Sequence, residues 1–172
     1  GTPAIQGQGK YFIDAGHSTT IYNGECVKIS SGYVVGGNGS AADIVGVLNG
    51  IFYNDASTLK PTFANFYKAT ITPANSEDTV AFVMDDPFQQ YVVSSDAART
   101  QAQFLATYDM NSSAGSDTTG KSSSTLDTSE TGANNKQFRL IRSAEDPENE
   151  DITAAFFSGI VVSNLNSYNG HN

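Results

Sequence analysis

The sequence predicts an all-β protein, a barrel or sandwich of short antiparallel strands with an extended N-terminal arm and a long polar loop. Apolar residues occur in short clusters separated by Gly, Pro, Asn and Ser, which is the spacing of strands rather than of helices. Charged residues make up only 16% of the 172 positions, against about 25% in an average domain. Long surface helices need Glu, Lys and Arg on their solvent faces, so this composition disfavours them.

Strands are expected wherever an apolar cluster ends at a turn signal. In the first part of the chain these are 11–13, 21–22, 26–29, 33–35, 44–48 and 51–53. Asn23-Gly24 is typical of a tight hairpin turn, because both residues readily take positive φ angles. Gly46 and Gly50 stand inside apolar clusters and indicate a bulge or a close backbone approach.

The second part of the chain contains fewer clusters. Strands are expected at 79–84 and 90–93, with Asp85-Asp86-Pro87 as the turn between them, and at 104–108, 137–142 and 159–162. Residues 96–103 predict the one helix, with Ser95 as its N-cap. The segment 111–136 is polar apart from Leu126 and reads as a long loop with one short strand near 124–127.

These patterns divide the chain into four parts. An extended arm is expected at 1–10, because it is rich in Gly and Pro and has only Ile5 as an apolar anchor. A β domain is expected at 11–109 and a polar loop or flap at 110–136. Residues 137–172 are expected to complete the β body or to form a second small lobe.

Charge and composition disfavour several classes of partner. The net charge is −9 with no run of Lys or Arg, so nucleic acid is not an expected partner. No apolar stretch reaches the roughly 18 residues of a membrane-spanning helix, and the N-terminus lacks the basic and apolar regions of a signal peptide. Cys26, His17 and His171 are the only cysteine and histidines, so neither an internal disulfide nor a metal or other cofactor is expected.

The segment Gly115-Ser116-Asp117-Thr118-Thr119-Gly120-Lys121-Ser122 matches the phosphate-binding pattern G-x-x-x-x-G-K-[ST]. In a nucleotide site, Gly115, Gly120, Lys121 and Ser122 would contact the phosphates and magnesium. Such a loop requires a buried strand before it and a helix after it. The residues after Ser122 offer no apolar helical face, so a flexible polar loop is the favoured interpretation and a P-loop nucleotide-binding protein is the third functional alternative.

No other pattern points to catalysis, and the chain is not expected to be an enzyme. His17 and Ser18 are neighbours, and in a strand they would point to opposite faces. Cys26 lies in an apolar context, where a buried thiol is the ordinary outcome. The segment 80–85 resembles a magnesium-positioning strand, but it precedes the glycine loop, the reverse of the usual order. The acidic run 145–151 lacks calcium-loop spacing and is typical of solvated surface.

Several segments carry a resemblance to a known class of protein. They are Ile21–Ile29, Gly32–Val35, Asp43–Leu48, Lys60–Phe63, Ala81–Pro87 and Gln137–Arg142. The pattern resembles capsid decoration (cement) proteins and other structural virion proteins of tailed bacteriophages. The resemblance implies a protein of the outer capsid surface that clamps neighbouring capsid subunits, with the major capsid protein as its partner and self-association as a trimer or dimer.

An arm that cannot bury itself can add a strand to the open sheet edge of a partner. On this interpretation Ile5, Tyr11 and Phe12 are the candidate capsid-interface residues. The alternative is a carbohydrate-binding or adhesin-like β-sandwich module, whose aromatic side chains would form an exposed platform for sugar rings. The two are separated by the exposure of the tyrosines, which are Tyr11, Tyr33, Tyr53, Tyr67, Tyr91 and Tyr108.

Overall fold

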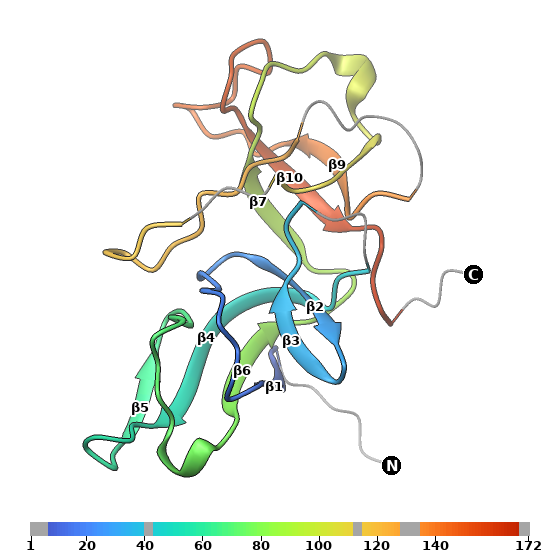
Figure 1. The fold of residues 1–172 in the computed structure, drawn as a ribbon. Coiled ribbons are helices and arrows are strands. Elements are labelled where there is room, and N and C mark those ends of the chain that lie inside the picture. Colours follow the sequence, from blue (N-terminus) through green and yellow to red (C-terminus); the bar gives the residue numbers. More distant parts are fainter. Residues whose placement is uncertain (1–6, 40–42, 112–114, 128–134, 169–172) are drawn as a thin grey trace. The chain divides into compact units, whose positions relative to one another are not determined.

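The structure, a computed structural model, describes residues 7–39, 43–111, 115–127 and 135–168 (Figure 1). The chain forms two compact units. Unit 1 is built from the described residues within Gly1–Gly36, Val45–Asp86 and Gly115–Ser122, and unit 2 from those within Gly37–Ile44, Pro87–Ala114 and Ser123–Asn172. The range 11–109, expected to be one β domain, therefore contributes to both units.

The predicted all-β class with short antiparallel strands is confirmed. In the described residues the strands are β1 (Gly9–Ile13), β2 (Cys26–Ser30), β3 (Tyr33–Gly36), β4 (Gly46–Asn54), β5 (Pro61–Ala64), β6 (Thr79–Met84), β7 (Gln90–Ser94), β8 (Thr107–Tyr108), β9 (Phe138–Ser143) and β10 (Ser158–Ser163). The helical elements of these same residues are two 3-10 turns, η1 (Ala74–Ser76) and η2 (Gln101–Gln103).

The sheet of unit 1 has the strand order β1-β6-β4-β2-β3, and β5 pairs with the far end of β4. The long strand β4 bends along its length (Figure 1). The sheet curls enough for the two end strands of this path, β1 and β3, to contact each other. No hydrogen-bonded pairing between β1 and β3 is found among the described residues, so the sheet is strongly curled without being a closed barrel.

Alternation along the strands sets the core of unit 1. Ile13, Ile51, Ala81 and Val83 are fully buried, and the residues between them along each strand face the other way. Val27, Val34 and Leu48 complete the same apolar cluster from β2, β3 and β4. Burial of this one face stabilises the unit and leaves the opposite face of β1, β6, β4 and β5 outside the core.

The predicted close backbone approach at Gly46 is confirmed. A Cβ atom at this position would overlap the carbonyl oxygen of Met84 on the neighbouring strand β6. The register of β4 against β6 shifts between Leu48 and Gly50, which is a β-bulge at Asn49. The two expected strands 44–48 and 51–53 are thus one bulged strand, β4.

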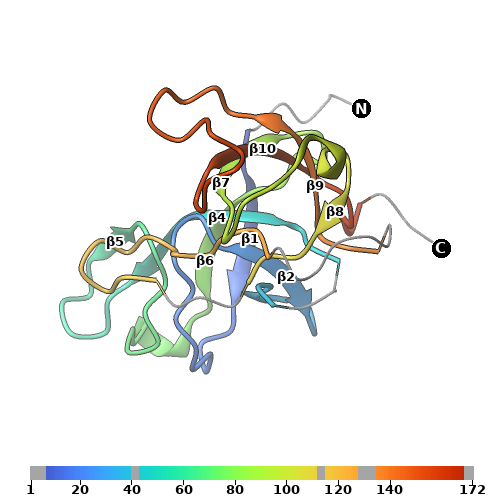
Figure 2. The ribbon, with the colours of Figure 1, turned by 90° about the horizontal axis from the view of Figure 1, so that it is seen from above.

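Unit 2 contains the second sheet, with the order β7-β10-β9-β8 (Figure 2). All three pairings are antiparallel. Its buried apolar side chains include Tyr108, Phe138, Leu140 and Val161. Leu126, which stands almost alone in a polar stretch of sequence, is also buried, and it forms isolated bridges with Ser95 and Met110 instead of the expected short strand.

A buried polar network holds the segments of unit 2 together around Gln137, whose side chain is fully buried. Its Nε2 donates to the carbonyl oxygen of Gly37 at 2.6 Å, and its Oε1 accepts from the amide of Met110 at 3.0 Å. Asp109 accepts from the Gln137 amide at 3.1 Å and from Lys136 Nζ at 3.0 Å. Buried polar groups of this kind are stable only when they are paired, so the network fixes how these segments meet.

One cation is also buried in unit 2. The guanidinium of Arg99 lies 4.1 Å from the centroid of the Tyr108 ring, a cation–π contact. None of its three nitrogens has a hydrogen-bond partner among the described residues. Removal from water lowers the pKa of this group, and Tyr108, Asp96 and Asp127 partly oppose that shift.

Further expected elements differ from the structure. The strand expected at 21–22 is only an isolated bridge between Ile21 and Tyr67. The helix 96–103 is only the 3-10 turn η2, capped by Thr100 rather than Ser95, because no apolar face is available to hold a longer helix against the sheet. The strand 104–108 is shortened to β8. Within the arm expected at 1–10, Gly9 and Lys10 pair with Val83 and Phe82 of β6, and residues 1–6 lie outside the described residues.

The burial of His17 in unit 1 predicts a pH dependence of stability. Its Nε2 is buried and has no hydrogen-bond partner in the part of the chain that the structure describes. Its ring packs on Tyr67 at 5.5 Å between centroids, and burial lowers the pKa of His17, partly opposed by Asp14. The unfolded chain therefore binds a proton more readily than the folded chain. We expect the free energy of unfolding to fall as the pH drops through about 6.5, the pKa of an unperturbed histidine.

The measurement is the urea midpoint as a function of pH. In His17→Gln this part of the decrease should disappear. Glu25 acts in the opposite direction at lower pH. Burial raises the pKa of its carboxyl group, so this residue raises the free energy of unfolding as the pH falls. An unchanged slope in His17→Gln would show that other groups cause it.

Candidate interaction surface

The outer face of the first sheet carries an apolar row that crosses four strands. In the strand registers Phe12 of β1 lies opposite Val80 of β6, Val80 opposite Phe52 of β4, and Phe52 opposite Phe63 of β5. Directly opposed residues of antiparallel strands share a face. Together with Phe82, these four residues are called the aromatic face below.

The aromatic face is packed as well as exposed. Phe63 is 67% exposed and Phe12 is 44% exposed, whereas Phe52, Val80 and Phe82 are half-buried. Phe63 lies over Gly50, where its ring fills the space that a side chain would take, and its centroid is 5.8 Å from that of Phe82. The side chains are therefore held in place before any partner arrives, which lowers the entropic cost of binding.

Lys10 is a charged residue of β1 that lies beside the aromatic face. It stands opposite Phe82 and two residues before Phe12 on β1, and its Nζ lies 5.5 Å from the centroid of the Phe12 ring. The contact is a cation–π interaction at an exposed site. A partner that covers Phe12 would also meet this positive charge.

The structure separates the three predicted capsid-interface residues. Ile5 lies outside the described residues. Tyr11 faces the core side of β1, half-buried, with its hydroxyl donating to Asp85 Oδ2 at 2.7 Å. Phe12 points to the outer face. Of the described pair, only Phe12 presents its side chain on the outer face.

The predicted phosphate-loop segment forms a turn packed on unit 1. Gly120 N donates to Ser116 O at 2.6 Å and Ser116 N donates to Lys121 O at 2.9 Å, while Asn23 and Lys121 form a parallel bridge. Gly120 is buried with φ of +70°. Five backbone amides of this segment already donate hydrogen bonds to oxygen atoms of the protein itself: those of Ser116, Thr119, Gly120, Lys121 and Ser122. A phosphate-binding loop would direct such amides at its ligand, and no helix follows within residues 121–127.

The side chains of this segment also bond to unit 1. Asp117 accepts from the Tyr22 hydroxyl at 2.8 Å and pairs with Lys68 Nζ at 3.2 Å. The hydrogen bond from Tyr22 lowers the pKa of Asp117, with Lys68 as the next cause. Asn65 Nδ2 donates to Thr119 O at 2.9 Å. The segment thus has a structural role in unit 1.

The exposure of the tyrosines bears on the carbohydrate alternative. None of the six tyrosines named above is exposed, and Tyr67 and Tyr108 are buried with their hydroxyls on backbone carbonyl oxygens. In the described residues the aromatic side chains with the largest exposure are phenylalanines and Tyr168. Phenylalanine lacks the polar atom with which a sugar platform also hydrogen-bonds.

The cysteine, the histidine and the acidic run that the sequence analysis considered do not form a common site in the described residues. Cys26 is buried, and His17 is half-buried against Tyr67. The acidic run 145–151 forms local turns in which Asp146 and Asp151 accept from nearby residues. Within the described ranges, no group of three or more His, Cys, Asp or Glu side chains could hold a metal ion. No helix there is long and apolar enough to cross a membrane.

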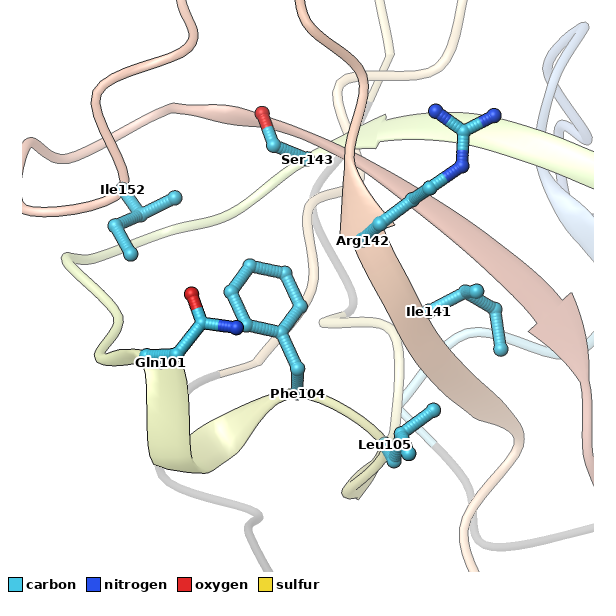
Figure 3. A pocket seen from close by; sticks show the side chains of 7 residues that line it. All are labelled: Gln101, Phe104, Leu105, Ile141, Arg142, Ser143 and Ile152. Carbon is cyan, nitrogen blue, oxygen red and sulfur yellow. The ribbon is translucent and has the colours of Figure 1, made fainter.

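Unit 2 contains an open pocket of about 370 Å³ between η2 and β9 (Figure 3). Its apolar lining comes from Phe104, Leu105, Ile141 and Ile152, and its polar lining from Gln101, Arg142 and Ser143. Figure 3 shows the Phe104 ring between Ile152 and β9. We refer to it as the unit 2 pocket.

Leu105 stands in this lining at a strained backbone position. Its φ is +66°, and it is held there by a hydrogen bond from its amide to Leu140 O at 2.7 Å and by one from Arg139 Nη1 to its carbonyl oxygen at 2.6 Å. The side chain is 60% exposed. An exposed leucine with positive φ is an unusual arrangement, and such strain persists only where the surroundings enforce it.

The residues that sequence reasoning did not find are Phe52, Phe63 and Phe82. Only Phe82 had a sequence signal, the alternation in 79–84 that places Val80 and Phe82 on one face.

Comparisons of this chain with models of protein families, with curated proteins and with solved structures found no match.

Proposed function

We propose that this protein is a structural virion protein that binds the outer surface of an icosahedral bacteriophage capsid and stabilises it by clamping neighbouring capsid subunits. The contact surface is the aromatic face of the first sheet. The observation that carries the proposal is the apolar row Phe12–Val80–Phe52–Phe63, which crosses four strands and ends in side chains that are 44% and 67% exposed. Contiguous apolar surface of this kind marks interaction sites.

The chemistry of the face suits a protein partner. Large aromatic side chains carry most of the binding energy at protein interfaces, especially when packing holds them in a single position. The Phe63 ring over Gly50 and beside Phe82 meets that condition. Lys10 would add one positive charge at the edge of the contact.

The electrostatics suit the outside of a filled capsid. The chain carries a net charge of −9. Such a charge is repelled by the phosphates of a packaged genome, and it keeps the protein soluble on a solvent-facing shell. The resemblance to decoration proteins supplies the identity of the partner, the major capsid protein.

The test is cosedimentation of the purified protein with emptied heads from a panel of tailed bacteriophages, marine phages included. We expect the unmodified protein to bind one type of head and to raise the temperature at which that head opens. Phe63→Ser should weaken this binding by at least about tenfold, as expected for an aromatic anchor at an interface. Its own thermal unfolding should change little, because Phe63 lies on a short edge strand and is largely exposed.

The matched control is Leu59→Asn. Leu59 is also exposed, at 72%, and lies outside the aromatic face, and asparagine tolerates its φ of +55°. This variant should bind heads like the unmodified protein. Failure to bind any head, or equal binding by Phe63→Ser, would refute the proposed contact.

A further inference from the structure

We propose that the unit 2 pocket binds a basic peptide segment of a partner protein, in which one large apolar side chain has lysine or arginine residues on both sides. The pocket belongs to unit 2 and the aromatic face to unit 1, so this site is a second one and does not depend on capsid binding. Three observations carry the proposal: the apolar lining of the pocket, the hydrogen bonds that fix this lining, and the carboxylates on two sides of it.

The pocket is large enough for one apolar side chain and the backbone beside it. Its volume of about 370 Å³ exceeds the roughly 150 Å³ of an apolar cavity that holds a benzene ring. Gln101 and Ser143 bring polar atoms to the lining, which can bond to the backbone of an incoming segment. The apolar part of the lining comes from Phe104, Leu105, Ile141 and Ile152.

Backbone hydrogen bonds hold two walls of the pocket in place. The backbone amide of Arg99 donates to Ile152 O at 2.6 Å, which ties the residues before η2 to the segment that contains Ile152. The amide of Leu105 donates to Leu140 O at 2.7 Å, which ties the residues after η2 to β9. Walls that are fixed before a ligand arrives lower the entropic cost of binding.

Carboxylates flank the apolar lining on two sides. Glu145 comes two residues after Ser143, and Asp151 comes directly before Ile152, so both ends of the acidic run 145–151 adjoin residues of the pocket. The run carries five carboxylates. An incoming segment is therefore attracted when it carries positive charge on both sides of its apolar side chain.

The cation in the lining, Arg142, offsets only part of this negative charge. Glu145 Oε1 lies 3.9 Å from Arg142 Nη1, which is at the limit of an ion pair. Asp151 Oδ1 accepts from the hydroxyl of Thr153 at 2.6 Å and from its amide at 2.9 Å, and these hydrogen bonds lower the pKa of Asp151. Five carboxylates against one guanidinium favour a basic occupant and disfavour an acidic one.

A partner protein fits this site better than a second copy of the chain. The segments of the chain that place apolar residues closely between two cations lie within 136–142, where Phe138 and Leu140 are buried in unit 2. Copies with a net charge of −9 also repel each other. The required basic segment must therefore come from another protein.

The test is a titration of fluorescently labelled synthetic peptides with the full chain, followed by fluorescence anisotropy. The probe is a short peptide in which one phenylalanine stands between two pairs of lysines. We expect it to bind, and to bind more weakly as the salt concentration rises, because exposed charges are screened. A peptide with alanine in place of the phenylalanine should bind at least about tenfold more weakly. A peptide with glutamates in place of the lysines should not bind.

Leu105→Asn removes one apolar side chain from the pocket and should weaken binding of the probe by at least about fivefold. Asparagine tolerates the φ of +66° at this position, and the leucine is largely exposed, so the fold should be retained. The matched control is Leu59→Asn, the same substitution at an exposed leucine of unit 1 with a φ of +55°. This variant should bind the probe like the unmodified protein.

A second pair of variants tests the charges. A chain with both Glu145→Gln and Asp151→Asn should bind the probe about fivefold more weakly at low salt and should lose much of the salt dependence. Its control carries Asp43→Asn and Glu77→Gln, which change the net charge equally at exposed positions outside the pocket lining and the acidic run. A loss of binding due to net charge alone would appear in both chains.

Three results would overturn the proposal: no binding of the lysine probe, equal binding of the glutamate peptide, or unchanged binding by Leu105→Asn. Sedimentation velocity of the protein alone provides a fourth. A dimer of the unmodified protein that Leu105→Asn dissociates would assign the pocket to a second copy. None of these results would bear on head binding, which is scored on Phe63.

Discussion

Gln137→Leu is expected to lower the free energy of unfolding by about 2 to 6 kcal/mol, because it leaves two buried backbone groups without partners at about 1 to 3 kcal/mol each. These groups are the carbonyl oxygen of Gly37 and the amide of Met110, which bond to Nε2 and Oε1 of Gln137. Leucine has a similar volume, so the change tests the hydrogen bonds rather than the packing. Urea unfolding monitored by tyrosine fluorescence measures the effect.

The control for this prediction is Gln90→Leu. Gln90 lies on the edge strand β7 with an exposed side chain, and its substitution should change stability by less than about 0.5 kcal/mol. If both variants unfold at the same urea concentration, the network around Gln137 does not hold unit 2 together.

Gly46→Ala should destabilise unit 1 by several kcal/mol, and Gly46→Val should prevent folding at ordinary temperature. The new Cβ would overlap the carbonyl oxygen of Met84 and come within 2.9 Å of Val83 Cγ1, so β4 and β6 would have to separate in the middle of the sheet. Backbone atoms cannot turn aside as a flexible side chain can, which makes this overlap costly. The measurement is the melting temperature by circular dichroism.

Gly7→Ala provides the comparison, because a Cβ at this described and exposed position meets no atom within 4 Å. It should melt like the unmodified protein. A Gly46→Ala variant with an unchanged melting temperature would contradict the strand spacing described for unit 1.

The all-β class and most strand positions could be predicted, because short apolar clusters bounded by turn residues leave few other ways to bury apolar surface. Sequence patterns could also predict one tertiary contact, since a glycine inside an apolar cluster indicated a bulge or a close backbone approach at Gly46. Strand β5 was missed, because a four-residue edge strand beginning with proline has no strong pattern of its own. A short strand was expected near 124–127, but the partners of Leu126 could not be predicted, because Ser95 and Met110 are distant from it in sequence.

The candidate surface was predicted only at Phe12. Its other members come from β4, β5 and β6, and their common face depends on strand registers between segments as distant as β1 and β6. A register displaced by one residue would turn each of these side chains into the core. Local patterns do not determine such pairings, so the aromatic face could be recognised only from the folded chain.

The interleaving of the two units has a consequence for synthesis on the ribosome. Unit 1 lacks its last segment until residue 122 has left the exit tunnel, whereas unit 2 needs residues near 37 together with strands that end near 163. Neither unit can finish folding before the segments that interleave with it have been synthesised. Residues 37–44 must therefore wait for β9 and β10 before their contacts in unit 2 can form.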